Sequence, residues 1–133
     1  MNIKEEFRLA LRELVYPVCV VSTYNDETKE NHAITVSSVT SLSFEPPSIL
    51  VCINKDSSIH SSLKKDSNFN ISFLSSSQTE ISNLCGTDEL SDKRFDNDFW
   101  DFKNNIGFIK NSQSVISCTC LLYTSDAADD MAS

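Results

Sequence analysis

The alternation of apolar and polar residues predicts one helix at the start of the chain, followed by short strands. Between Ile3 and Val15, apolar residues recur every three or four positions with charged residues between them, which is the pattern of an amphipathic helix ending before Pro17. We expect this helix to cover one end of a sheet. The β-branched run at 18–24 predicts the first strand, and the polar residues 25–31 predict a hairpin connection after it.

A second strand begins near Ala33 and is rich in serine and threonine. Hydroxyl and apolar side chains alternate along it until residues 39–40 break the pattern, which predicts a bulge or bend there. The double proline at 46–47 cannot donate hydrogen bonds to a sheet, so the strand must end at that point. Residues 48–54 are nearly all apolar, and we expect them to be buried on both faces or at an interface.

The rest of the chain has weaker patterns. It predicts a short helix carrying Ile59, Ser62 and Leu63, a strand at 69–74, a second short helix at 79–84, a loop at 87–105 and a last strand at 114–122. Asp56 or Ser57 is placed to cap the first of these helices, and Gly86 stands where a left-handed residue would end the second. The predicted fold class is mainly β with short flanking helices.

Length and charge restrict the function. A chain of 133 residues fits one domain with a substantial core. Lysine and arginine total 11 against 19 acidic residues, a net charge of −8, so binding to a nucleic-acid backbone is not expected. The chain lacks an apolar run long enough to span a membrane and begins without a signal-peptide pattern. We therefore expect a cytoplasmic protein with no membrane partner.

The cysteines and glycines exclude several kinds of site. Five cysteines are an odd number, and most lie inside apolar runs, so a disulfide scaffold is not expected. Cys118 and Cys120 are too close together for a C-x2-C zinc site, and we predict no metal. Gly86 and Gly107 are the only glycines, which excludes the G-x-G-x-x-G turn of a Rossmann domain.

The last residues differ in character from the rest. Residues 121–133 contain three of the five alanines and no lysine or arginine. We interpret 1–120 as the domain and 121–133 as a non-native tail that resembles translated adapter sequence. A native acidic tail is the alternative.

The six hydroxyl side chains between positions 35 and 43 are the strongest candidates for ligand binding. A hydroxyl that is buried without a hydrogen-bond partner costs about 1–3 kcal/mol, so backbone, water or a polar ligand must satisfy this group if it is buried. The alternative is that these side chains face solvent, where serine and threonine are common on strands. The same segment also carries a family resemblance.

Seven sequence words occur in an order that resembles the flavin reductase-like family. They are FRLALREL, YPVCVVST, ITVSSVTSLSFEPPSILVCIN, KDSSIHSSLKKD, FNISFLS, LCG and DKRF. The resemblance covers residues 7–120 and implies a homodimer of Greek-key split β-barrels that holds FMN or FAD near the dimer interface. It also implies hydride transfer from NADH or NADPH to the flavin, a reaction whose chemistry belongs to the cofactor, so we predict no catalytic side chain.

The resemblance assigns flavin-binding residues to two segments. The T-V-S-S word implies contacts to the flavin ring from Thr35, Val36, Ser37 and Ser38, and contacts on the ribityl side from Ser41, Leu42 and Ser43. The turn after the next strand implies a phosphate site at Asn54, Lys55, Ser57 and Ser58. The alternative for Ser57 and Ser58 is a purely structural role as helix caps. The DKRF word resembles a lid region, with a surface ion pair as the alternative.

The chain departs from the family pattern at two places. Ala33 stands where many members have glycine. The strands that close the barrel, and a Gly-Asp-His loop before them, are missing after Cys120. We therefore expect a split barrel that is truncated before closure, with an exposed sheet edge that lowers stability and favours association.

Three functions remain open. The first is an NAD(P)H-dependent flavin reductase, with a partner monooxygenase as a recipient of the reduced flavin. The second is a flavin-binding electron carrier without a nicotinamide site. The third is a β-barrel interaction module without flavin. The sequence distinguishes neither FMN from FAD nor NADH from NADPH, and it leaves the activity of the 133-residue form open.

Overall fold

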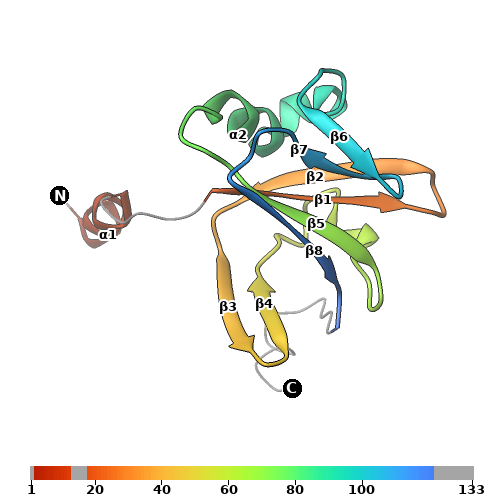
Figure 1. Ribbon diagram of the computed structural model, residues 1–133. Coiled ribbons are helices and arrows are strands. Elements are labelled where there is room, and N and C mark those ends of the chain that lie inside the picture. The colour runs from red at the N-terminus through yellow and green to blue at the C-terminus, as the bar shows by residue number, and fades with distance from the viewer. Residues whose placement is uncertain (1, 13–17, 122–133) are drawn as a thin grey trace.

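A four-stranded antiparallel sheet with two separate hairpins forms the molecule in the computed structural model, which describes residues 2–12 and 18–121 (Figure 1). The strand order in the sheet is β2-β1-β5-β8. The elements are α1 (Ile3–Arg12), β1 (Cys19–Asn25), β2 (Glu30–Val36), β3 (Val39–Phe44), β4 (Pro47–Val51), the 3₁₀ helix η1 (His60–Ser62), β5 (Asn68–Phe73), α2 (Thr79–Gly86), the 3₁₀ helix η2 (Asp88–Lys93), β6 (Trp100–Lys103), β7 (Ile106–Ile109) and β8 (Ser114–Thr119). Within the described residues the strands do not close into a barrel, as the sequence led us to expect.

The sheet separates two hydrophobic clusters. Alternate side chains of β1 point to opposite faces, so Cys19 and Val21 belong to one cluster and Val20 to the other. Ile59 of the segment before η1 packs with the first cluster, and Trp100 of β6 packs with the second. The apolar run that predicted β1 therefore reflects burial on both faces.

The hydroxyl-rich segment is not one strand. It leaves the four-stranded sheet at residues 37–38 and continues as β3, which pairs with β4 in a projecting hairpin (Figure 1). The predicted bend is therefore confirmed, although it lies two residues earlier than 39–40, and a register shift follows between Ser41 and Ser43. Burial of 48–54 on both faces is wrong for the single chain, because Leu50 is 49% exposed on the projecting hairpin.

The β6–β7 hairpin was missed, because residues 87–105 were interpreted as a loop. Asn104 and Asn105 both have positive φ, at 54° and 71°, which is the backbone of a two-residue hairpin turn that asparagine tolerates. The alternating charged and aromatic residues around this turn hid the strand pattern.

Three side chains of the sheet form hydrogen bonds to the backbone of the β6–β7 hairpin. Ser22 Oγ donates to Gly107 O at 2.5 Å, and Asn70 Nδ2 donates to the same oxygen at 3.1 Å. Ser72 Oγ accepts a hydrogen bond from Ile109 N at 3.1 Å. These three polar side chains are buried and yet satisfied, so their burial carries little penalty.

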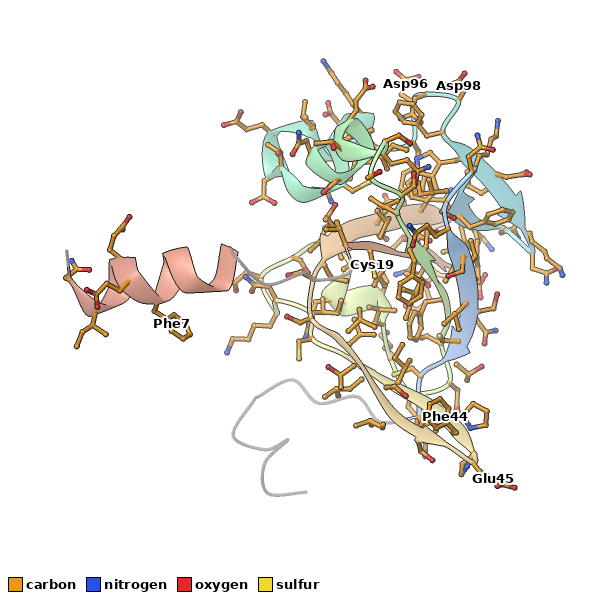
Figure 2. All side chains as sticks on the ribbon, turned by 60° about the vertical axis from the view of Figure 1, so that its left-hand side comes forward. Phe7, Cys19, Phe44, Glu45, Asp96 and Asp98 are labelled. Carbon is orange, nitrogen blue, oxygen red and sulfur yellow. The ribbon has the colours of Figure 1, made fainter. Side chains whose placement is uncertain are left out.

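The first helix stands away from the sheet (Figures 1 and 2). Ile3 and Phe7 on its apolar face are 83% and 65% exposed. The expectation that this helix covers one end of the sheet is wrong for the described residues. Its predicted end near Val15 lies in 13–17, outside them.

Two further helix predictions need correction. No α-helix follows Asp56 or Ser57, since the structure has a turn and the three-residue η1, which has no side-chain cap. Gly86 is the last residue of α2 and does not have positive φ, and Thr87 after it is extended. The left-handed helix end is therefore wrong, and a buried arginine described below takes over the terminal carbonyls. No helix in the described part of the chain is long and apolar enough to cross a membrane.

The predicted tail almost entirely lies outside the described residues, which end at Leu121. It stays a prediction.

We predict different effects of alanine at the two glycines. A Cβ atom on Gly107 would lie 2.8 Å from Trp100 Cε3 and 3.1 Å from Phe102 Cε1, so Gly107→Ala should lower the free energy of unfolding by about 1–3 kcal/mol. A Cβ on Gly86 meets Thr35 Cβ at an ordinary 3.5 Å inside a helix, so Gly86→Ala should leave stability unchanged or raise it by up to about 1 kcal/mol. Urea unfolding followed by tryptophan fluorescence measures both. Equal effects of the two substitutions would contradict the packing described here.

Candidate functional site

Ser37 and Ser38 occupy the link between β2 and β3. Both residues are exposed, and neither hydroxyl has a hydrogen bond to another described residue. Ser38 O accepts a hydrogen bond from Cys52 N at 3.2 Å, which holds this link beside the end of β4. The two hydroxyls are therefore accessible at the base of the β3–β4 hairpin.

The predicted phosphate turn begins at the same hairpin base. Asn54 follows Cys52 by two residues, so the backbone contact between Ser38 and Cys52 brings the two predicted groups together. Asn54 Oδ1 accepts a hydrogen bond from Asp56 N at 2.9 Å, and Ser57 Oγ donates to Asn54 O at 2.6 Å. These two side chains shape the turn itself.

Lys55 and Ser58 of the same turn are exposed. The turn does not open an α-helix, so no α-helix N-terminus is present to assist Lys55 in binding a phosphate. Its cationic and hydroxyl side chains remain accessible at the hairpin base.

The side chains of Thr35 and Val36 contact α2 and the hydrophobic core, respectively. Thr35 Oγ1 donates to Ser82 O of α2 at 2.7 Å, and Val36 lies in the cluster that packs around Ile59, with 8% exposure. Neither side chain is therefore free to bind a ligand at the hairpin base.

Ser41, Leu42 and Ser43 lie further along the hairpin. Ser41 pairs with Ile49, and Ser43 Oγ accepts a hydrogen bond from Glu45 N at 3.1 Å near the hairpin tip, where Figure 2 labels Phe44 and Glu45. Strand geometry places Ser41 about 10 Å from Ser38. This group is therefore separate from the base and could contact only an extended ligand.

Two cavities among the described residues lie away from these hydroxyls. A cavity of about 730 Å³ lies between the β1–β2 turn, β5, β8 and the β6–β7 turn, and another of about 360 Å³ lies beside α2 and β7. Neither is lined by any of the eleven predicted flavin-binding residues. The idea that burial forces these hydroxyls to find a ligand is wrong for Ser37, Ser38 and Ser41, and the alternative of solvent exposure holds for them.

A buried arginine was missed as a core residue. Arg94, from the DKRF word, is 5% exposed and makes its hydrogen bonds to backbone carbonyl oxygens. The alternative of a surface ion pair is therefore wrong. The neighbouring aromatic residues do anchor the core, since the rings of Phe95 and Trp100 lie 4.4 Å apart and Trp100 is buried.

Two of the cysteine thiols are buried in the core. Burial raises the pKa of Cys19 and of Cys85 to about 11, although the nearby Arg94 charge partly offsets the effect at Cys85. No cluster of three or more metal-ligating side chains occurs among the described residues.

The comparison with protein families decides the assignment. The family model described as the flavin reductase like domain matches residues 11–130. The chain belongs to the flavin reductase-like family. The predicted family and the split-barrel fold class are thereby confirmed.

Two characterised relatives are named as a reductase component and as an oxidoreductase. The chain is 28% identical over 118 residues to the reductase component of FADH(2)-dependent resorcinol hydroxylase from Rhizobium sp. (strain MTP-10005). It is 30% identical over 116 residues to NADH:riboflavin 5'-phosphate oxidoreductase from Streptomyces pristinaespiralis. These matches cover 88% and 86% of this chain but 66% and 64% of those proteins, so the chain spans less than two thirds of the length of its flavin reductase relatives.

Solved structures of flavin reductases share the fold. BorF, the flavin reductase component of a bacterial two-component tryptophan halogenase, superposes with a TM-score of 0.73 at 26% identity, covering 87% of this chain and 73% of that one. The NADH:FAD oxidoreductase SgcE6 of Streptomyces globisporus C-1027 gives a TM-score of 0.72 at 23% identity, covering 90% and 73%.

We predict that alkylation distinguishes the cysteines of this flavin reductase-like chain. At pH 8 a thiol with a pKa of about 11 is only about 0.1% ionised, so buried Cys19 and Cys85 should resist iodoacetamide while exposed Cys52 reacts first. Mass spectrometry of peptides after timed labelling measures the order, and labelling in urea serves as the control. Labelling of Cys85 as fast as Cys52 under native conditions would contradict the packing of α2.

The same pKa shifts predict how the free energy of unfolding depends on pH. Because folding raises the thiol pKa above the ordinary value of 9.0, the folded chain holds these protons to higher pH than the unfolded chain. The free energy of unfolding should therefore fall as the pH rises from about 9 to 11.

Proposed function

We propose that this chain is part of an NADH-dependent flavin reductase that transfers hydride to FMN or FAD. The observation that supports this most directly is the pair of free hydroxyls at Ser37 and Ser38, next to the turn that carries Lys55. Membership of the flavin reductase-like family and the names of its relatives support the same reaction. Because relatives include reductase components of two-component systems, a monooxygenase is the proposed recipient of reduced flavin.

The groups at the hairpin base suit a flavin. The ring edge offers several acceptors and one N–H donor, and a hydroxyl can both donate and accept, so Ser37 and Ser38 can match it. Lys55, Asn54 and Ser58 offer a charge and polar groups for the phosphate, with Ser57 shaping their turn. Ser41 and Ser43, with Leu42 between them, are proposed to follow the ribityl chain, and Thr35 and Val36 to contribute backbone groups.

The bound flavin would accept hydride from NADH and pass it on. The chain binds and orients the ring, and a water-excluding cover is needed over the exposed hydroxyls. We propose that a second copy provides this cover, since Phe44 and Leu42 of the hairpin are 90% and 63% exposed. A cytoplasmic location, where NADH is supplied, completes the proposal.

The test of the reaction mixes the purified chain with NADH or NADPH and with FMN or FAD, and follows nicotinamide absorbance. We expect oxidation of NADH that depends on added flavin. Flavin fluorescence quenching without NADH oxidation would instead favour an electron carrier, and no quenching with either flavin would favour a module without flavin and overturn the proposal.

The test of the site replaces the two free hydroxyls. Ser37→Ala together with Ser38→Ala should raise the dissociation constant for FMN about tenfold, because two hydrogen bonds to the ring are lost. The matched control removes two exposed hydroxyls at other ends of the sheet, with Thr28→Ala and Ser114→Ala, and should leave the constant unchanged. Equal constants in both double variants would place the flavin elsewhere.

A further inference from the structure

Arg94 is a buried cation that binds three backbone carbonyls. Nη1 donates to Ala33 O at 2.6 Å, Nε to Leu84 O at 3.2 Å, and Nη2 to Thr87 O at 3.2 Å. No ion pair with a carboxylate is formed by Arg94 among the described residues. A buried charge of this kind persists only where well-placed dipoles replace its hydration.

The three carbonyls belong to two elements that must be held together. Leu84 and Thr87 lie at the C-terminal end of α2, where the carbonyl dipoles favour a cation. Ala33 lies on β2, which is an edge strand of the sheet and has a neighbouring strand on one side only. The guanidinium therefore ends the helix and ties it to the edge strand, which explains why Gly86 is not needed in a left-handed conformation.

A second contact between the same elements lies two residues closer to the proposed flavin site. Thr35 Oγ1 donates to Ser82 O at 2.7 Å, and the helix backbone at Gly86 passes close to the Thr35 side chain. β2 ends one residue later at Val36, and Ser37 and Ser38 follow directly. The direction in which the two hydroxyls leave the sheet is thus set by how α2 holds the last residues of β2.

The backbone of Arg94 is itself fixed from the other side. Trp100 Nε1 donates to Arg94 O at 2.5 Å, and Asn97 Nδ2 donates to the same oxygen at 2.9 Å. Trp100 in turn packs against Gly107 of the β6–β7 hairpin. The arginine cannot move to accommodate a displaced β2 without disturbing this hairpin.

We propose that Arg94 is a positioning residue for flavin binding, which acts by holding the end of β2 against α2 so that Ser37 and Ser38 face the ligand. This rests on the proposed function, since it names how the same site is organised. Arg94 does not touch the flavin.

The experiment compares Arg94→Met and Arg94→Lys with two controls. Arg94→Met keeps an unbranched apolar stem and removes all three donors, and Lys93→Met removes the same charge from an exposed neighbour. Thr23→Ala is a control for stability, because its buried hydroxyl donates to Asn68 O and its side chain lies on the face of the sheet opposite α2 and the β6–β7 hairpin. Each variant is measured for urea unfolding, for the FMN dissociation constant, and for amide hydrogen exchange at residues 33–38.

We expect Arg94→Met to raise the FMN dissociation constant at least tenfold, with the KM for flavin rising more than the KM for NADH. Exchange at 33–38 should be at least tenfold faster than in Thr23→Ala at matched stability. Arg94→Lys, which can still donate to one of the carbonyls, should recover part of both effects. Lys93→Met should match the parent chain.

Two results would overturn the proposal. One is an FMN constant in Arg94→Met equal to that of Thr23→Ala, which would mean that Arg94 contributes stability alone. The other is unchanged exchange at 33–38 in Arg94→Met, which does not depend on flavin at all. If the parent chain binds no flavin, the proposed function fails, while the exchange measurement still decides whether Arg94 holds this segment.

Discussion

Burial of β1 on both faces is the constraint on which the rest of the structure depends. Residues from Cys19 to Thr23 are essentially inaccessible, so each face of this strand must be covered by a separate layer. On one face the cover comes from α2 and the β6–β7 hairpin, and on the other from η1 and the β3–β4 hairpin. Polar side chains interrupt the strand only where they find a partner, as Ser22 and Thr23 do.

The candidate flavin site forms where these two layers separate. β2 belongs to the sheet and is covered by α2, while β3 leaves the sheet for the opposite side, and the change of direction falls on Ser37 and Ser38. Backbone that leaves one sheet for another has polar groups without a strand partner, which makes such a link suited to bind a polar ligand. The turn with Lys55 returns to the same place because β4 pairs with β3.

Much of the fold could be predicted from the sequence, because apolar periodicity reports burial. It located β1, β5, β8 and α2, whose apolar side chains enter the two clusters. It failed at the β6–β7 hairpin, where the turn depends on Asn104 and Asn105 adopting positive φ and the strands are held by side chains distant in sequence. It also failed at Arg94, since a charged residue is assumed to be exposed and its three carbonyl partners come together only in the folded chain. The sequence left burial and exposure of Ser37 and Ser38 as alternatives, because the outcome depends on where the hairpin turns away.

The anchoring of the β6–β7 hairpin through its main chain has a consequence for protein engineering. Ser22, Ser72 and Asn70 recognise an amide and a carbonyl of the main chain, so these contacts do not depend on the side chains that the hairpin directs outward. Asn104 and Asn105 are exposed at that end. The turn is therefore a natural place to graft a peptide tag or a fluorescent reporter, remote in the chain from the hydroxyls at the β2–β3 link.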